Sequence, residues 1–223
     1  MDACAAMLRA IEADVRATAR RTGRARLAPP VRAALAAVRR AAFVPADQAA
    51  AAYANHPLPI GHGQTISQPF IVALMTDLLD LRATDRVLEV GTGSGYQAAV
   101  LARLAAHVWS IEVVPALAAQ ARAALAAEGV ANVSLKIGDG ALGWPDAAPF
   151  DRITVTAAAM TVPDALVAQL HAPGRMVIPV GEPGGAQDLR LIEKDAAGAV
   201  RSRAVLDVAF VPLVAGAAKE ASA

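Results

Sequence analysis

A glycine-rich turn between an apolar strand and a helix constrains the fold of this sequence more than any other feature. Residues 86–97 read RVLEVGTGSGYQ, and the β-prone Val87, Leu88 and Val90 ahead of the glycines predict a buried strand. Three alternating glycines then allow a sharp bend and the close approach of a ligand. Helical apolar spacing over residues 96–104 predicts a helix whose free N–H groups suit a polar or anionic ligand.

The glycines alone leave the identity of the ligand open. Counted from Gly91, a GxGxxG dinucleotide motif fails at Tyr96, but it nearly fits from Gly93, so a dinucleotide site is not excluded. A phosphate-binding P-loop is excluded, because no lysine follows the glycines. Glu89 favours a third ligand, since an acid before the first glycine repels phosphates and holds an ammonium group directly or through water. This pattern resembles the first motif of S-adenosylmethionine-dependent methyltransferases. A tight turn that binds nothing is the structural alternative.

Composition and charge exclude several classes of function. With a net charge of +1 over 223 residues, the chain has no basic field for nucleic acid or an anionic membrane. No apolar stretch reaches the roughly 18 residues of a membrane span, and the charged N-terminus argues against a signal peptide. Cys4 is the only cysteine, so neither an internal disulfide nor a cysteine-based metal site is expected. We therefore expect a cytoplasmic, monomeric protein without a metal.

The length of the chain indicates one domain over residues 1–223, built from distinct segments. Helical spacing with proline and glycine breaks predicts an N-terminal helical cap over residues 1–45. Residues 46–70 contain too much proline and glycine for a regular element, so we expect a long structured loop, a kind of segment that often carries function. Residues 71–214 form the expected cofactor-binding core, and residues 215–223 are expected to be a disordered tail.

Strand and helix patterns alternate along the core. Strands are predicted at residues 86–90, 108–112, 133–137, 150–156, 176–178, 189–192 and 208–211, and helices at residues 70–79, 96–104, 115–128 and 163–170. This alternation predicts an α/β fold with a doubly wound, mostly parallel, Rossmann-like sheet whose last strands are less regular.

Ligands of such sheets bind at the carboxyl ends of the strands. Gly91, Glu112, Asp139 and Thr156 each end or follow a predicted strand, so we expect all four along one edge. Glu112 lies 21 residues after Gly91, close to the spacing of roughly 20 at which an acid binds ribose hydroxyls. Asp139 stands between two glycines, where its carboxylate could accept a hydrogen bond from an adenine amino group.

Three segments together resemble the protein-L-isoaspartate O-methyltransferase family. They are LPIG and GQTISQP within residues 58–69, the glycine turn at 87–97, and GDG and GW within residues 138–144. Shorter matches at residues 148–151, 155–158 and 210–213 extend the resemblance over about residues 31–214. The glycine motif is shared by many methyltransferases, whereas the loop around Ser67 is far more specific and carries the assignment.

The resemblance implies a class I methyltransferase fold, S-adenosylmethionine as cofactor, and methylation of the free α-carboxylate of isoaspartyl residues in damaged proteins or peptides. It implies that Ser67 is the active-site residue and that Thr65 and Ile66 cover the methionine part of the cofactor. Further implied cofactor contacts lie in the glycine turn and after later strands, at Gly91, Gly93, Gly95, Glu112, Asp139 and Gly140. Glu89, singled out above, completes the predicted set.

Three positions depart from the family pattern. Arg39 stands where the family often has proline, and Pro173 interrupts an expected pair of glycines. Both changes should affect only local structure. Ala209 replaces a frequent arginine, and we expect weaker contact with the surroundings of the substrate.

The chemistry of carboxylate methylation fits the polar residues of the loop. A carboxylate with a pKa of about 4 is ionised at pH 7, so no general base is required, and the loop has no nearby Asp or Glu. Ser67 is then expected to align the acceptor by a hydrogen bond. A hydrolase in which His56 or His62 activates Ser67 is one alternative. The others are a non-catalytic S-adenosylmethionine-binding protein of the same fold and a methyltransferase with another acceptor.

Overall fold

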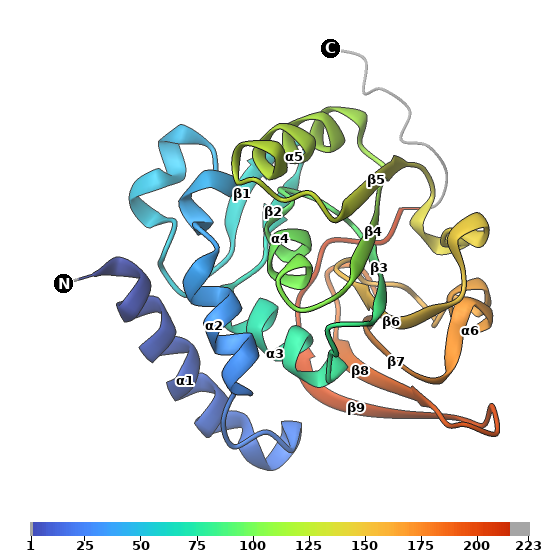
Figure 1. Ribbon diagram of the computed structural model, residues 1–223. Helices are drawn as coiled ribbons and strands as arrows, with labels where there is room; N and C mark the ends of the chain where they lie inside the picture. The colour runs from blue at the N-terminus through green and yellow to red at the C-terminus, as the bar shows by residue number, and fades with distance from the viewer. Residues whose placement is uncertain (1, 215–223) are drawn as a thin grey trace.

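The computed structural model describes residues 2–214, and a seven-stranded sheet forms its centre (Figure 1). The strand order is β5–β4–β3–β6–β7–β8–β9. The strands are β3 (Arg86–Val90), β4 (His107–Glu112), β5 (Val133–Ile137), β6 (Phe150–Val155), β7 (Leu170–Gly181), β8 (Gln187–Lys194) and β9 (Val200–Val208). Strands β3 to β7 are parallel to one another, whereas β8 runs antiparallel to β7, and β9 runs antiparallel to β8. The predicted Rossmann-like, mostly parallel α/β sheet is confirmed. The expected disordered tail lies outside the described residues.

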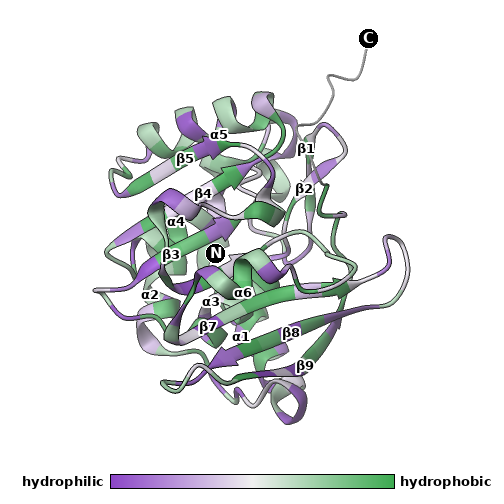
Figure 2. Cartoon of the chain, turned by 90° about the vertical axis from the view of Figure 1, so that its right-hand side faces the viewer, coloured by the Kyte–Doolittle hydropathy of each residue, from purple (hydrophilic) through white to green (hydrophobic). Residues whose placement is uncertain are grey.

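Helices cover both faces of this sheet because its strands are apolar on both sides. The helices of the core are α3 (Pro69–Leu79), α4 (Tyr96–Ala102), α5 (Pro115–Ala127) and α6 (Asp164–Gln169), with short 3-10 turns η3 (Gly140–Leu142) and η4 (Pro145–Ala147). Successive side chains of a strand point to opposite faces. Val87 therefore packs with α3, α4 and α5, while Leu88 packs with α6. Figure 2 shows hydrophobic and hydrophilic turns alternating along α5, whose apolar side faces the sheet.

The predicted strand at residues 208–211 is wrong. Among the described residues the last strand is β9, which ends at Val208, and the strand pairing of residues 209–214 is limited to an isolated bridge between Pro212 and Ala158. Proline has no N–H for a strand ladder, while β9 is an edge strand with polar, exposed residues at 201–203. Polar residues are common on exposed edges, so the apolar pattern marked the wrong segment.

Two helices, α1 (Ala3–Thr22) and α2 (Pro29–Ala37), form the N-terminal cap, as predicted. The periodic Leu8, Ile11 and Val15 of α1 are buried, and this helix packs against α3 and β9. Gly23 ends α1 in the left-handed region at φ +73°, and its N–H donates to the Ala19 carbonyl. The 3-10 turns η1 (Arg40–Phe43) and η2 (Ala46–Ala51) then lead toward the site.

The segment before α3 contains a regular element that its composition hides. Residues 58–66 form a small antiparallel hairpin of β1 (Leu58–Gly61) and β2 (Gln64–Ile66). Its turn has His62 and Gly63 at positive φ, which explains the glycine-rich sequence. The expectation of no regular element here was therefore wrong in part. In residues 2–214, no helix is long and apolar enough to cross a membrane.

Candidate active site

A pocket lies at the carboxyl ends of β4, β3 and β6. The chain runs outward from β3 through β4 to β5 and then crosses back to β6 on the other side of β3, and such switch points are where α/β sheets bind ligands. Thr156, directly after β6, donates from Oγ1 to the Gly91 carbonyl at 2.6 Å and thereby ties two strand ends together. Gly91 has φ +93°, and a Cβ there would clash with Thr156 Oγ1. The hydrogen bond between Thr156 and Gly91 therefore requires glycine at position 91.

The carboxylate of Glu112 organises the glycine turn from the end of β4. Its Oε2 accepts from the Gly93 N–H at 2.7 Å, and its Oε1 accepts from the Val114 N–H at 3.0 Å. Glu112 is only 5% exposed and lines the pocket. Each carboxylate oxygen has a second lone pair. The side chain can therefore shape the turn and still accept from hydroxyls of a ligand, as predicted for ribose.

Glu89 lies beneath this turn and does not line the pocket. It is completely buried on β3, and Ser110 on the neighbouring β4 donates to its Oε2. The hydroxyl of Thr92, which does line the pocket, lies 2.6 Å from the hydroxyl of Ser110. A contact with a ligand would therefore be transmitted through Ser110 and Thr92. Burial raises the pKa of Glu89 to about 8, the Ser110 hydrogen bond lowers it, and the charge of Glu112 raises it.

This raised pKa predicts a pH-dependent stability. Between the ordinary pKa of 4.5 and about 8, the folded protein keeps a proton on Glu89 that the unfolded chain releases. The free energy of unfolding contributed by this group therefore falls as pH rises through that window. Glu89→Gln should remove this dependence. The free energy of unfolding of the variant, relative to that of the parent, should therefore be higher at pH 8 than at pH 5.5. Urea denaturation at both pH values measures the difference.

Glu182→Gln is the matched control, because Glu182 is exposed, and its stability difference from the parent should not change with pH. A Glu89→Gln difference that is the same at both pH values would contradict the assigned protonation state.

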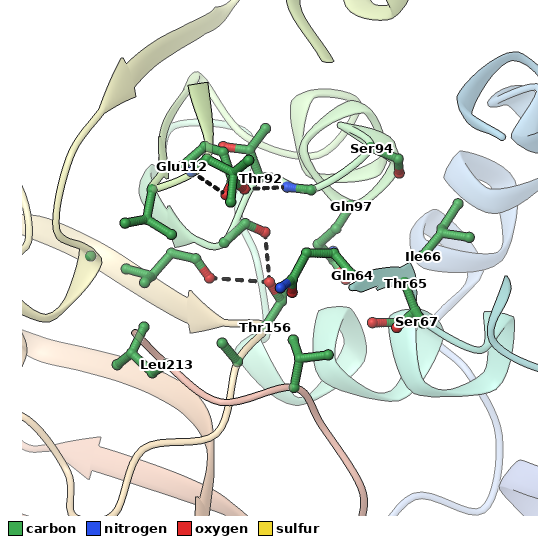
Figure 3. A pocket seen from close by; sticks show the side chains of 18 of the residues that line it. Gln64, Thr65, Ile66, Ser67, Thr92, Ser94, Gln97, Glu112, Thr156 and Leu213 are labelled. Atoms are coloured by element: carbon green, nitrogen blue, oxygen red, sulfur yellow. Dashed lines mark hydrogen bonds between the residues drawn. The ribbon is translucent and has the colours of Figure 1, made fainter. Parts of the chain in front are cut away.

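The hairpin forms the opposite wall of the pocket. Gln64, Thr65, Ile66 and Ser67 line it, and Figure 3 shows the Ser67 hydroxyl turned toward the pocket. Ile66 is buried and anchors this wall, whereas Thr65 is exposed. Ser67 Oγ makes no hydrogen bond to any residue in the described range 2–214. Its hydroxyl is therefore free to donate to an incoming group.

A second pocket adjoins the first behind this wall. Thr65, Ser67, Thr156 and Val211 line both pockets. The other walls of the second pocket come from α1, the start of α3, the end of β9 and the segment after it, and include Asp14, Thr18, Phe70, Asp207, Ala209 and Phe210. Two separate spaces thus meet at Ser67.

Most of the residues predicted for the site come together. Thr65, Ile66, Ser67, Gly91, Gly93, Glu112 and Gly140 line the first pocket, whereas Glu89, Gly95 and Asp139 do not. Gly95 instead turns the chain at φ +88° and packs against Ala121 of α5. Asp139 Oδ1 accepts from the Ala141 N–H at 2.8 Å and so caps η3. These two residues support the walls of the pocket.

Several residues of the pocket were not among those predicted for the site. Val211 and Leu213 line it, Figure 3 shows Leu213 at its edge, and hydrogen bonds with Ala158 after β6 hold this segment in place. Thr92, Ser94 and the buried Gln97 also line it. The apolar pattern around Val211 predicted a strand that the structure does not contain, so only the resemblance to the family pointed to this segment.

Comparison with known proteins agrees with this geometry. The family described as protein-L-isoaspartate(D-aspartate) O-methyltransferase matches residues 17–218. A protein-L-isoaspartate O-methyltransferase from Anaeromyxobacter dehalogenans strain 2CP-1 is 64% identical over 181 residues, which are 81% of this chain and 87% of the relative. Protein-L-isoaspartate O-methyltransferase 2 from Syntrophobacter fumaroxidans is 54% identical over 212 residues, 95% of this chain and 86% of the relative. A solved protein-L-isoaspartate O-methyltransferase superposes with a TM-score of 0.79 at 25% identity, over 92% of this chain and 65% of that chain.

The sheet, the glycine turn and the acid at the end of β4 agree with the solved neighbours, and the fold is that of a class I methyltransferase. Within that class, the chain belongs to the protein-L-isoaspartate O-methyltransferase family. It is an enzyme, and its reaction is S-adenosylmethionine-dependent methylation of isoaspartyl residues in proteins.

Proposed function

We propose that the first pocket binds S-adenosylmethionine, that the second receives the isoaspartyl residue, and that Ser67 aligns the two. The observation that carries this assignment is the shared wall, because Thr65 and Ser67 line both pockets. Methyl transfer needs donor and acceptor atoms about 3–3.5 Å apart and in line. Residues common to both pockets lie where such an approach would occur.

The residues of the first pocket fit an adenosyl cofactor. The spare lone pairs of Glu112 suit ribose hydroxyls, and Gly140 lies after β5, beside the cap made by Asp139. Thr65 and Ile66 would cover the methionine part from the hairpin. Gly91, Gly93 and Gly95 form the turn, and Glu89 would act through Ser110 and Thr92. When bound, the cofactor supplies a methyl group on a sulfonium with a neutral thioether leaving group.

The second pocket fits an acceptor that needs alignment and no base. An isoaspartyl α-carboxylate is ionised at pH 7, and the free hydroxyl of Ser67 can donate to it. The hydrolase alternative receives no support from the geometry. In the described part of the chain no histidine is hydrogen bonded to Ser67, and His56 Nδ1 lies 2.9 Å from the Pro57 carbonyl oxygen instead.

Glu112→Ala tests the cofactor assignment. Loss of a hydrogen bond to a charged group costs about 1.5–3 kcal/mol, so affinity for S-adenosylhomocysteine should fall about ten- to a hundredfold. Part of the loss will come from the turn, because the Gly93 and Val114 N–H groups lose their acceptor. Glu112→Gln keeps one acceptor oxygen and should bind with intermediate affinity. Calorimetry measures the affinity of the parent, Glu112→Ala and Glu112→Gln for S-adenosylhomocysteine.

Glu128→Ala is the control, because Glu128 lies at the end of α5 and pairs with the exposed Arg39. It should bind S-adenosylhomocysteine like the parent. Equal affinity of Glu112→Ala and the parent would reject the assigned role, and tighter binding of NAD than of S-adenosylhomocysteine would reject the cofactor.

The departures from the family pattern support the same layout. Ala209 lines the second pocket, where a missing arginine side chain leaves more room around the substrate. Arg39 is exposed and pairs with Glu128, and Pro173 lies in β7, where the pairing with β6 is irregular.

We also propose that the protein acts as a monomer in the cytoplasm. Both pockets are built from one chain, and Cys4 is the only cysteine.

A further inference from the structure

Arg40 is a buried cation whose contacts join three segments of the site. It lies at the start of η1 and is completely buried. Its Nε donates to the Ala52 carbonyl at 2.8 Å, and its Nη2 donates to the Ser67 carbonyl at 2.8 Å. Its guanidinium carbon lies 4.8 Å from the centroid of the Tyr96 ring, a cation–π distance.

These three partners belong to the two walls of the cofactor pocket and to the segment that leads into them. Ser67 follows the hairpin, while Tyr96 is the first residue of α4, directly after the glycine turn, and both line the pocket. Ala52 follows η2. A guanidinium is a rigid planar fork. A single rigid group therefore sets the distance between the backbone of Ser67 and the glycine turn.

Packing alone does not account for a charge at this position. A buried charge without a counter-ion is costly, and Arg40 forms no ion pair with any residue in the range 2–214. Burial lowers the pKa of Arg40 to about 10, which leaves it charged at pH 7. Its Nη1 has no hydrogen-bond partner among the described residues. An apolar side chain would fill the same space without this cost but would leave the Ala52 and Ser67 carbonyls without a donor.

We propose that Arg40 is a positioning residue for methyl transfer. It holds the backbone of Ser67 at a fixed distance from the glycine turn, so that the Ser67 hydroxyl can hold the acceptor carboxylate in line with the methyl group. This inference rests on the proposed role of Ser67. Arg40 itself lines neither pocket, so its effect on the reaction passes through Ser67.

Arg40→Lys tests the inference, because one ammonium group cannot reproduce a fork that reaches two carbonyls and covers a ring. The kcat for an isoaspartyl peptide should fall about tenfold or more. The Kd for S-adenosylhomocysteine should change less than about threefold, because the Glu112 contacts remain. Arg39→Lys is the matched control at the adjacent position, where the side chain is exposed and pairs with Glu128. It should match the parent in both measurements.

A double-mutant cycle with Ser67→Ala separates positioning from general destabilisation. If Arg40 acts through Ser67, the double variant should be little slower than the slower single variant. Multiplied effects on kcat, or a parent-like kcat for Arg40→Lys, would overturn the inference. If circular dichroism shows that Arg40→Lys is unfolded, Arg40→Gln takes its place in the cycle. Failure of both variants to fold would also overturn it, since Arg40 would then serve the fold as a whole.

Failure of the proposed function can be distinguished from failure of the inference about Arg40. A parent protein that transfers no methyl group, or a Ser67→Ala variant with full activity, would reject the role of Ser67 before Arg40 is considered.

Discussion

A peptide with an L-isoaspartyl residue should be methylated at least about a hundredfold faster than the same peptide with an aspartyl residue, because a misplacement of about 1 Å costs roughly that factor. The isoaspartyl linkage adds a methylene to the main chain and displaces a free α-carboxylate from it. We expect the second pocket, which Ser67 lines, to select for the position of that carboxylate. An aspartyl residue presents its carboxylate elsewhere, which leaves the donor unpaired and spoils the in-line approach.

Discrimination should depend on the linkage more than on the flanking residues. The net charge of the chain is +1, and the second pocket has both apolar and polar walls, which do not form a groove that reads sequence. The measurement is methyl incorporation into paired peptides that differ only at this linkage, with several different flanks. Comparable rates for both members of a pair would reject isoaspartyl repair and leave a methyltransferase with another acceptor.

Ser67→Ala should lower kcat on an isoaspartyl peptide about ten- to a hundredfold. The expected loss of transition-state stabilisation is about 1.5–3 kcal/mol, the range for a hydrogen bond to a charged group. Affinity for S-adenosylhomocysteine should change little, because Glu112 and the glycine turn remain intact. Single-turnover methyl transfer together with calorimetry separates the two effects.

Two further variants control for the loss of a hydroxyl. Ser67→Thr keeps a donor at the shared wall and should retain more activity than Ser67→Ala. Ser134→Ala removes a hydroxyl on β5 that bonds His107 on β4, away from both pockets, and should leave kcat unchanged. Unchanged turnover of Ser67→Ala would remove Ser67 from the mechanism. A covalent adduct trapped on Ser67 would restore the hydrolase alternative.

The sequence was most informative where local chemistry decides the structure. The apolar strand, glycines and helix of residues 86–97 interact with near neighbours, so their pattern predicts β3, the turn and α4 directly. The acid at the end of β4 was predicted from its place after an apolar strand and its spacing from Gly91, and Glu112 does line the pocket. The parallel sheet followed from the alternation of strands and helices.

Where contacts link distant segments, prediction from the sequence failed. The β1–β2 hairpin was missed because proline and glycine suggested an irregular loop, and β9 was missed because an exposed edge strand carries polar residues. Glu89 was expected to hold a ligand directly or through water. The register of β3 with β4 places it beside Ser110 and beneath the turn, outside the residues that line the pocket.

By itself, the sequence determined the α/β class, the glycine turn, the acid at the end of β4 and the family, because these depend on local patterns. Only the tertiary structure decided that Thr65, Ser67, Thr156 and Val211 line both pockets, and that Arg40 donates a hydrogen bond to the Ser67 carbonyl. These residues come from segments far apart in the chain. Their contacts exist only after the sheet, the hairpin and the cap have packed together, and no local pattern in the sequence encodes that packing.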